Sequence, residues 1–169
     1  GYTGRESVTN QLLDSLELLE YRGYDSAGIA TLNGETGKVK LRKCAGRVND
    51  LRKLCKKDKK ISTCGIGHTR WATHGGVSDE NAHPHRNGDV LLVHNGIIEN
   101  YEELKDHFML HKELKSQTDT EVVAAVLNRF YQGDPHEAIR KTVKYLRGTF
   151  ALVIMFKDQP DVIYAIRNV

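Results

Sequence analysis

Residues 27–42 read AGIATLNGETGKVKLR, and this stretch indicates the fold class. The first six residues form the short, largely apolar run that is typical of a buried strand. Residues 33–37 contain an asparagine and two glycines, which suit a tight turn. Beyond the turn, Val39 and Leu41 alternate with basic residues, which predicts a strand with one solvent-exposed face. We therefore expect an antiparallel hairpin.

The rest of the chain continues with hairpin pairs and runs of helices. Apolar residues predict helices over 7–20, 48–55, 100–108, 119–130 and 135–147, and strands over 62–69, 89–94, 149–157 and 162–166. Asn100, Thr118 or Asp119, and Asp134 stand where helix caps are favoured. Because strands and helices do not alternate strictly, we predict one α+β domain with antiparallel sheets and helices on the outer faces.

Composition excludes several classes of partner. Twenty-five Lys and Arg against 22 Asp and Glu leave a net charge of +3, too small to argue for nucleic acid or an anionic membrane. The lysine-rich run over 56–60 is expected to be a solvated helix end. The longest apolar run, over 150–156, is far shorter than a membrane helix. The three cysteines form no Cys-x-x-Cys pair, and no leader opens the chain, so we expect free thiols and a cytoplasmic location.

The densest group of reactive side chains is HTRWATHG, residues 68–75, at the end of a predicted strand. Its Arg70 is either a surface arginine or a forked donor to a carboxylate or phosphate. Asp119 is either a first-turn helix acid or a partner for a ligand ammonium. Used together, Arg70 and Asp119 would fit an α-amino acid, one at each charged end.

Two further segments allow more than one interpretation. Asn95-Gly96 is a strong signal for a hairpin turn, but it could instead offer an amide and a bare backbone N–H to an oxyanion. Since residues 97–98 lead directly into the helix expected at Asn100, we favour the second interpretation. Five histidines suggest a metal site, but they lack a familiar zinc spacing, so we expect no metal, no cofactor, and histidines that orient the loop by hydrogen bonds: His68, His74, His83, His85 and His94.

Five segments occur in order along the chain: EYRGYDSAG at 20–28, HTRWATHG at 68–75, NAHPH at 81–85, HNGIIEN at 94–100 and TDTE at 118–121. Together they resemble the glutaminase domain of the glucosamine-6-phosphate synthase family, the glutamine–fructose-6-phosphate aminotransferases, over essentially the whole chain. The resemblance implies an N-terminal-nucleophile hydrolase fold, a four-layer αββα sandwich of antiparallel sheets. It also implies glutamine hydrolysis that supplies ammonia for converting fructose 6-phosphate to glucosamine 6-phosphate.

The resemblance further implies roles for individual residues. Arg70 would hold the α-carboxylate of L-glutamine and Asp119 its ammonium. Asn95 and Gly96 match the oxyanion hole, and Arg22 matches a supporting position near the nucleophile. The loop that closes over glutamine and gates ammonia transfer is matched by three residues, Trp71, Thr73 and His74.

The ends of the sequence depart from the family pattern. The family opens Cys-Gly-Ile-Val before the Gly-Tyr that matches residues 1–2, and its amino-terminal cysteine is the nucleophile. The interior cysteines, Cys44, Cys55 and Cys64, do not match it. We therefore expect residues 1–169 to be an incomplete glutaminase domain, inactive alone, whose intact protein adds a carboxyl-terminal isomerase domain and dimerises through it. The alternatives are a glutamine-binding regulatory module without a nucleophile, or the glutaminase domain of another class II amidotransferase.

Overall fold

The first sheet is built around the predicted hairpin. In the computed structural model, which describes residues 1–56, 61–72 and 75–168, β2 (Ser26–Leu32) pairs with β3 (Val39–Ala45). On its other side β2 pairs with β4 (Cys64–Arg70), and β4 pairs with the short β1 (Tyr2–Thr3). All three pairings are antiparallel and give the order β1-β4-β2-β3. The hairpin prediction is confirmed.

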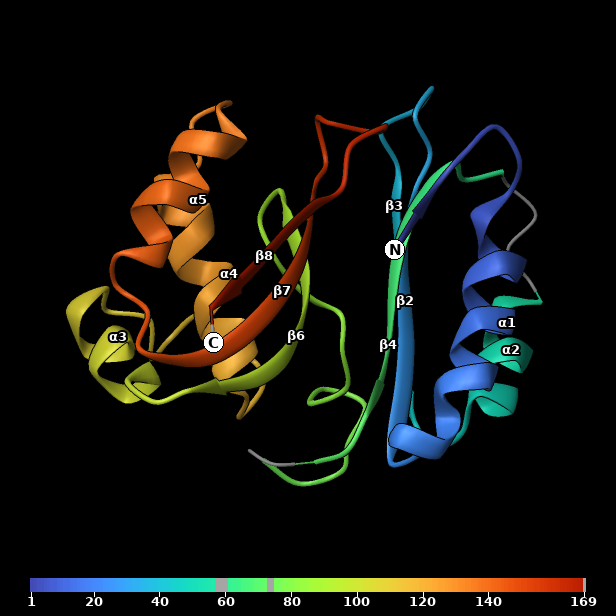
Figure 1. Ribbon diagram of the computed structural model, residues 1–169, viewed down its shortest axis with the longest axis horizontal. Helices are drawn as coiled ribbons and strands as arrows, with labels where there is room; N and C mark the ends of the chain where they lie inside the picture. Colours follow the sequence, from blue (N-terminus) through green and yellow to red (C-terminus); the bar gives the residue numbers. More distant parts are fainter. Residues whose placement is uncertain (57–60, 73–74, 169) are drawn as a thin grey trace.

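The second sheet has the order β5-β6-β7-β8, again with antiparallel neighbours throughout. Its strands are β5 (His85–Asn87), β6 (Val90–Ile98), β7 (Gly148–Phe156) and β8 (Tyr164–Asn168). The helices are α1 (Val8–Leu19), η1 (Glu20–Arg22), α2 (Val48–Cys55), α3 (Tyr101–His107), α4 (Asp119–Phe130) and α5 (Pro135–Val143). Helices α1 and α2 cover one sheet and α3 to α5 the other, with the two sheets face to face between them (Figure 1). This is the predicted αββα sandwich.

Three apolar layers hold the four structural layers together, and strand alternation creates them. On β6, Val90 and Leu92 face the core under α3 to α5, whereas Leu91 and Val93 face the core between the sheets. On β2, Ile29 packs under α1 and α2 in the third core. Because successive side chains point to opposite faces, a strand that is covered on both sides needs an almost continuous apolar sequence.

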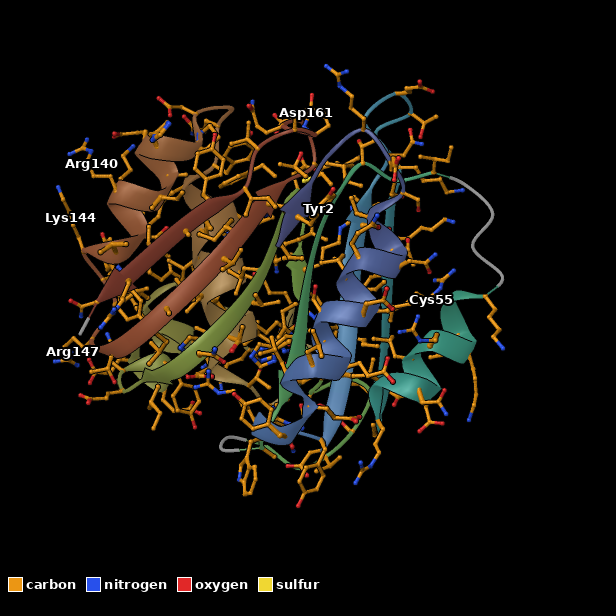
Figure 2. The ribbon with its side chains drawn as sticks, turned by 45° about the vertical axis from the view of Figure 1, so that its right-hand side comes forward. Tyr2, Cys55, Arg140, Lys144, Arg147 and Asp161 are labelled. Atoms are coloured by element: carbon orange, nitrogen blue, oxygen red, sulfur yellow. The ribbon has the colours of Figure 1, made fainter. Side chains whose placement is uncertain are left out.

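The two sheets also meet at one edge of the molecule. Tyr2 on β1 and Asp161 in the β7–β8 connection lie near this edge (Figure 2). There the Thr3 hydroxyl donates to the Asp161 carbonyl oxygen, at 3.4 Å. Strand β1 thus links the edge of the first sheet to the closing hairpin of the second.

The structure corrects two predictions around Asn100. The Asn100 side chain does not cap α3. Instead it donates to the Tyr145 carbonyl oxygen (2.8 Å) and accepts from the Arg147 backbone N–H (2.9 Å). The helix predicted to reach Arg147 ends at Val143 and gives way to tight turns over the next residues. The Asn100 side chain thus satisfies backbone groups of Tyr145 and Arg147, which therefore do not depend on hydrogen bonds within α5. The caps at Thr118 and Asp134 are confirmed.

The strand predicted over 89–94 continues to Ile98, so Asn95-Gly96 forms no turn and the hairpin interpretation is wrong. No strand was predicted over residues 85–87, but they form β5, which pairs with the start of β6. Leu19 and Leu54 belong to the apolar patterns that predict the helices over 7–20 and 48–55, but the structure exposes both side chains. Residues 57–60 of the lysine-rich run lie outside the described residues. Among the described residues, no helix has the length and apolar character needed to cross a membrane.

Candidate functional site

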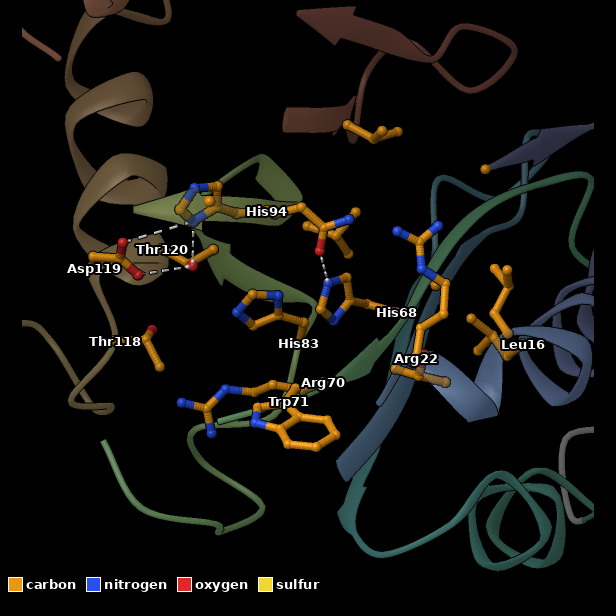
Figure 3. Close-up of a pocket in the computed structure, with 18 residues that line it drawn as sticks. Leu16, Arg22, His68, Arg70, Trp71, His83, His94, Thr118, Asp119 and Thr120 are labelled. Atoms are coloured by element: carbon orange, nitrogen blue, oxygen red, sulfur yellow. Dashed lines mark hydrogen bonds and ion pairs between the residues drawn. The ribbon is translucent and has the colours of Figure 1, made fainter. Parts of the chain in front are cut away.

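A cavity of about 460 Å³ collects the predicted residues from both sheets (Figure 3). Sheet residues enter it from β4, β6 and β7, and the start of α4 closes one side. Leu16 of α1 and Arg22 of η1 reach it from the helices over the first sheet. Of the predicted residues, six line the cavity: Arg22, Arg70, Trp71, Asn95, Gly96 and Asp119. Thr73 and His74 lie outside the described residues.

Arg70 ends β4 and is only 4% exposed. Its guanidinium donates to the Gly76 and Gly75 carbonyl oxygens, at 3.1 and 3.3 Å. Burial lowers the pKa of Arg70, while the charges of Asp119 and Asp25 act against that shift. The sequence allowed a surface arginine; the structure instead places a buried cation at the cavity wall, where an anion would be attracted.

The backbone after Arg70 is held by residues of the EYRGYDSAG segment. A side chain on Gly23 would come within 3.0 Å of the Trp71 nitrogen, so glycine permits this close approach. The Asp25 N–H donates to the Arg70 carbonyl oxygen (3.1 Å), and its carboxylate accepts from the Ala72 N–H (3.0 Å). Trp71 is 62% exposed at this end of the cavity, and its ring lies edge-on to the ring of Tyr24.

Asp119 is the first residue of α4 and is 5% exposed. Its Oδ2 accepts from the Ile98 N–H (2.9 Å), and its Oδ1 accepts from the Thr120 hydroxyl (3.3 Å). His94 Nδ1 lies 3.0 Å from the same hydroxyl oxygen and 3.8 Å from Oδ2. Thr118 caps the helix, as one of the two predicted alternatives, so Asp119 is left to face the cavity (Figure 3).

Asn95 and Gly96 lie within β6, opposite Ala151 and Phe150 of β7. Gly96 has φ +124°, and a Cβ there would overlap the Thr149 carbonyl oxygen. Only glycine fits this position without strain. The side-chain oxygen of Asn95 is 2.7 Å from Nε2 of His68, which comes from the other sheet. The cavity therefore has amide groups on the β6 side as well as charges at Arg70 and Asp119.

His68 and His83 line the interior of the cavity, and His85 packs against His83 outside the lining. The rings of His68 and His83 are 4.4 Å apart, and those of His83 and His85 are 5.0 Å apart. Burial lowers the pKa of His68 to about 4 and places the pKa of His83 and of His85 well below the usual value. These rings are therefore neutral near pH 7. Among the described residues, no three His, Cys, Asp or Glu side chains gather as metal ligands.

Sequence reasoning missed Lys43 on β3, which anchors the loop that carries His83. Its ammonium donates to the carbonyl oxygens of Glu80 and Ala82, both at 2.8 Å. Burial lowers the pKa of Lys43 to about 8, against the opposing charge of Glu121. In sequence Lys43 interrupts the alternation, because it stands in the register of Val39 and Leu41 and not in that of Lys38, Lys40 and Arg42. This break was a local signal that could have identified it.

Comparisons with known proteins identify the family of this chain. Residues 68–168 match the family of glutamine amidotransferase domains. The chain belongs to this family. The glutamine–fructose-6-phosphate aminotransferase (isomerizing) of Caldanaerobacter subterraneus is 51% identical over 171 residues, and that of Aquifex aeolicus 49% over 174. Each alignment covers 99% of this chain, and the chain spans 28% of the length of either relative. The resemblance expected from the five segments is confirmed.

The fold is also similar to that of solved amidotransferases. Glutamine phosphoribosylpyrophosphate amidotransferase from B. subtilis superposes with a TM-score of 0.77 at 27% identity. The match covers 92% of this chain and 34% of that enzyme's chain. The predicted fold of the N-terminal-nucleophile hydrolase type is confirmed. Sequence identity is thus near 50% to the two glutamine–fructose-6-phosphate aminotransferases and 27% to this amidotransferase.

Proposed function

We propose that this chain is the glutaminase domain of a glutamine–fructose-6-phosphate aminotransferase. In the intact protein it would release ammonia from L-glutamine, and a carboxyl-terminal isomerase domain would use it to convert fructose 6-phosphate to glucosamine 6-phosphate. The names of the relatives and the family match support this proposal. We propose further that the isomerase domain forms a homodimer and that the enzyme is cytoplasmic, a compartment that suits its free, buried thiols.

One observation carries the proposal: Arg70 and Asp119 line the same cavity, although Arg70 ends strand β4 of the first sheet and Asp119 begins helix α4. A free α-amino acid presents a carboxylate and an ammonium, and each would find an opposite charge here. Arg70 has donors in a planar fork that matches a carboxylate. Two of its donors already bond to the loop carbonyls of Gly75 and Gly76, which holds the fork in place.

The register of β1 indicates how a nucleophile would enter the cavity. Tyr2 pairs with Gly65 and Thr3 with Cys64, so the same ladder continued backwards would place preceding residues opposite Gly67 to Arg70. Those four β4 residues line the cavity, as does Gly1. A preceding Cys-Gly-Ile-Val, as in the family, would therefore carry its cysteine along the cavity wall. The free α-amine of that cysteine has an ordinary pKa of about 7.7–8.0 and could act as its base.

The reaction would then proceed by acyl transfer. The cysteine sulfur would attack the side-chain amide carbon of glutamine, and the amide oxygen would take the negative charge. Asn95 and Gly96 would donate to this oxyanion. Ammonia would leave with a proton from the α-amine, and water would hydrolyse the thioester to glutamate. We assign closure over glutamine to the loop of Trp71, Thr73 and His74, and support of the nucleophile to Arg22.

The test uses the full-length protein expressed from its native gene, with glutamate release from glutamine as the readout. Arg70→Lys keeps the charge but removes the fork, so we expect the KM for glutamine to rise about 10- to 100-fold with kcat little changed. Arg129→Lys is the matched control, because Arg129 pairs with Glu113 at the surface (3.1 Å). An unchanged KM in Arg70→Lys would refute the assignment of Arg70. Glutamine binding without hydrolysis by the wild type would favour the regulatory module instead.

A further inference from the structure

His68 and Asn95 connect the two sheets at the cavity. His68 lies on β4 of the first sheet, Asn95 lies on β6 of the second, and both line the cavity. Their contact is short: Nε2 of His68 is 2.7 Å from Oδ1 of Asn95. Figure 3 shows this hydrogen bond as a dashed line from the His68 ring.

The direction of this hydrogen bond orients the Asn95 amide. A carbonyl oxygen can only accept, so His68 Nε2 carries the hydrogen and donates. The oxygen end of the amide is then bound to His68, and the Nδ2 end is left for another acceptor. No described residue provides an acceptor for this Nδ2 group. An acceptor in the cavity, such as an oxyanion, would satisfy it.

The His68 ring is itself held in one orientation. It packs on His83 at 4.4 Å, and His83 packs on His85 at 5.0 Å. Nε2 of His85 is 3.0 Å from the hydroxyl oxygen of Thr118, the cap of α4. The stack therefore runs from Asn95 to the helix end that carries Asp119, so the amide is fixed relative to the rest of the cavity.

We propose that His68 is a positioning residue for the oxyanion hole: its hydrogen bond fixes the Asn95 amide with the N–H groups available to the oxyanion. This inference rests on the proposed function, because it assigns a purpose to Asn95 that glutamine hydrolysis requires. His68 acts through Asn95 and touches no substrate atom in this proposal. Since burial lowers the pKa of His68 to about 4, the ring contributes a neutral donor at neutral pH and no charge.

The experiment compares three substitutions in the full-length enzyme, with kcat and KM for glutamine measured separately. His68→Phe keeps a ring and removes the donor, and we expect kcat to fall about 10- to 100-fold with KM changed less than about threefold. This fall in kcat should be smaller than the fall caused by deleting an oxyanion-hole donor, because the Asn95 amide remains in His68→Phe but is no longer held in one orientation. His68→Gln restores a neutral N–H donor and should recover kcat to within about threefold. His111→Phe is the matched control, because His111 makes a comparable bond to Asp106 on the exposed surface (2.6 Å).

A second measurement separates positioning from a merely structural role. In an Asn95→Ala background, His68→Phe should cause no further loss of kcat, because the group on which it acts is gone. The inhibition constant of glutamate γ-semialdehyde, to which the thiol adds to form a tetrahedral adduct, should rise by the same factor as kcat falls in His68→Phe. If His68→Phe does not fold, His68→Ala carries the same expectations.

Several results would overturn the inference: wild-type kcat in His68→Phe, an equal loss in His68→Gln, a loss confined to KM, or an undiminished loss in the Asn95→Ala background. A wild-type enzyme that hydrolyses no glutamine would instead overturn the proposed function. The two failures are therefore distinguishable in one set of assays.

Discussion

Acid should destabilise this chain through the histidines at its cavity, and the size of the effect can be worked out for the half-buried His68. Its pKa is lowered to about 4, chiefly by burial, with further lowering from the charges of His94 on β6 and Arg70 on β4. In the unfolded chain the pKa of a histidine is about 6.5. Below that pH the unfolded state binds the proton more readily than the folded state, so stability is complete above about pH 6.5 and falls as the pH decreases.

The magnitude follows from the two pKa values. Each unit of pKa difference corresponds to about 1.36 kcal/mol, so His68 alone should reduce the free energy of unfolding by about 2 kcal/mol between about pH 7 and pH 5. His83 and His85, whose pKa values burial also lowers, act in the same direction and add to the decline.

The assay is urea unfolding at about pH 7 and pH 5 for the wild type and His68→Gln. Glutamine does not titrate in this range, so the decline in unfolding free energy should be about 2 kcal/mol smaller in the variant. Val153→Ala is the control, because it alters an apolar residue of the same cavity and should lower stability equally at both pH values. An identical decline in His68→Gln and the wild type would refute the argument, whatever the absolute stabilities.

Two further predictions concern the backbone. Gly96→Ala would place a Cβ against the Thr149 carbonyl oxygen at φ +124°, so we expect a loss of about 2–4 kcal/mol in unfolding experiments; an unchanged midpoint would contradict the close contact. Asp134 accepts from the Glu137 N–H at the start of α5 (3.1 Å), so Asp134→Ala should cost about 1 kcal/mol, whereas Asp134→Asn should cost less. Equal losses in the two Asp134 variants would show that charge rather than capping matters there.

The sequence was sufficient for elements whose signals are local. The hairpin over 27–42 combines an apolar run, a turn and an alternating strand, and each of these signals acts within a few residues. The caps at Thr118 and Asp134 were predictable for the same reason, because a capping side chain bonds a backbone N–H three residues away. The αββα layering followed from resemblance, while the antiparallel α+β class followed from the order of elements.

Prediction from sequence failed where a partner distant in the chain decides the local conformation. Asn100 has the residue type of a cap, but its amide bonds Tyr145 and Arg147, 45 and 47 residues away. Asn95-Gly96 has the sequence of a turn, but β7 pairs with this segment and keeps it extended. In both cases the local preference exists, and a backbone partner from elsewhere in the chain outweighs it.

The candidate site likewise combines features that local residue types predict with features that depend on distant parts of the chain. Residue types identified Arg70 and Asp119 as a possible pair, because their charges suit the two ends of an amino acid. Their sharing of one cavity depends on β4 and α4 packing into one molecule, which no spacing in the sequence encodes. The role of His68 depends on still more: the two sheets must bring β4 against β6 before its ring can reach Asn95. A histidine that works only through a residue of the other sheet is indistinguishable, in sequence, from one that merely fills the core.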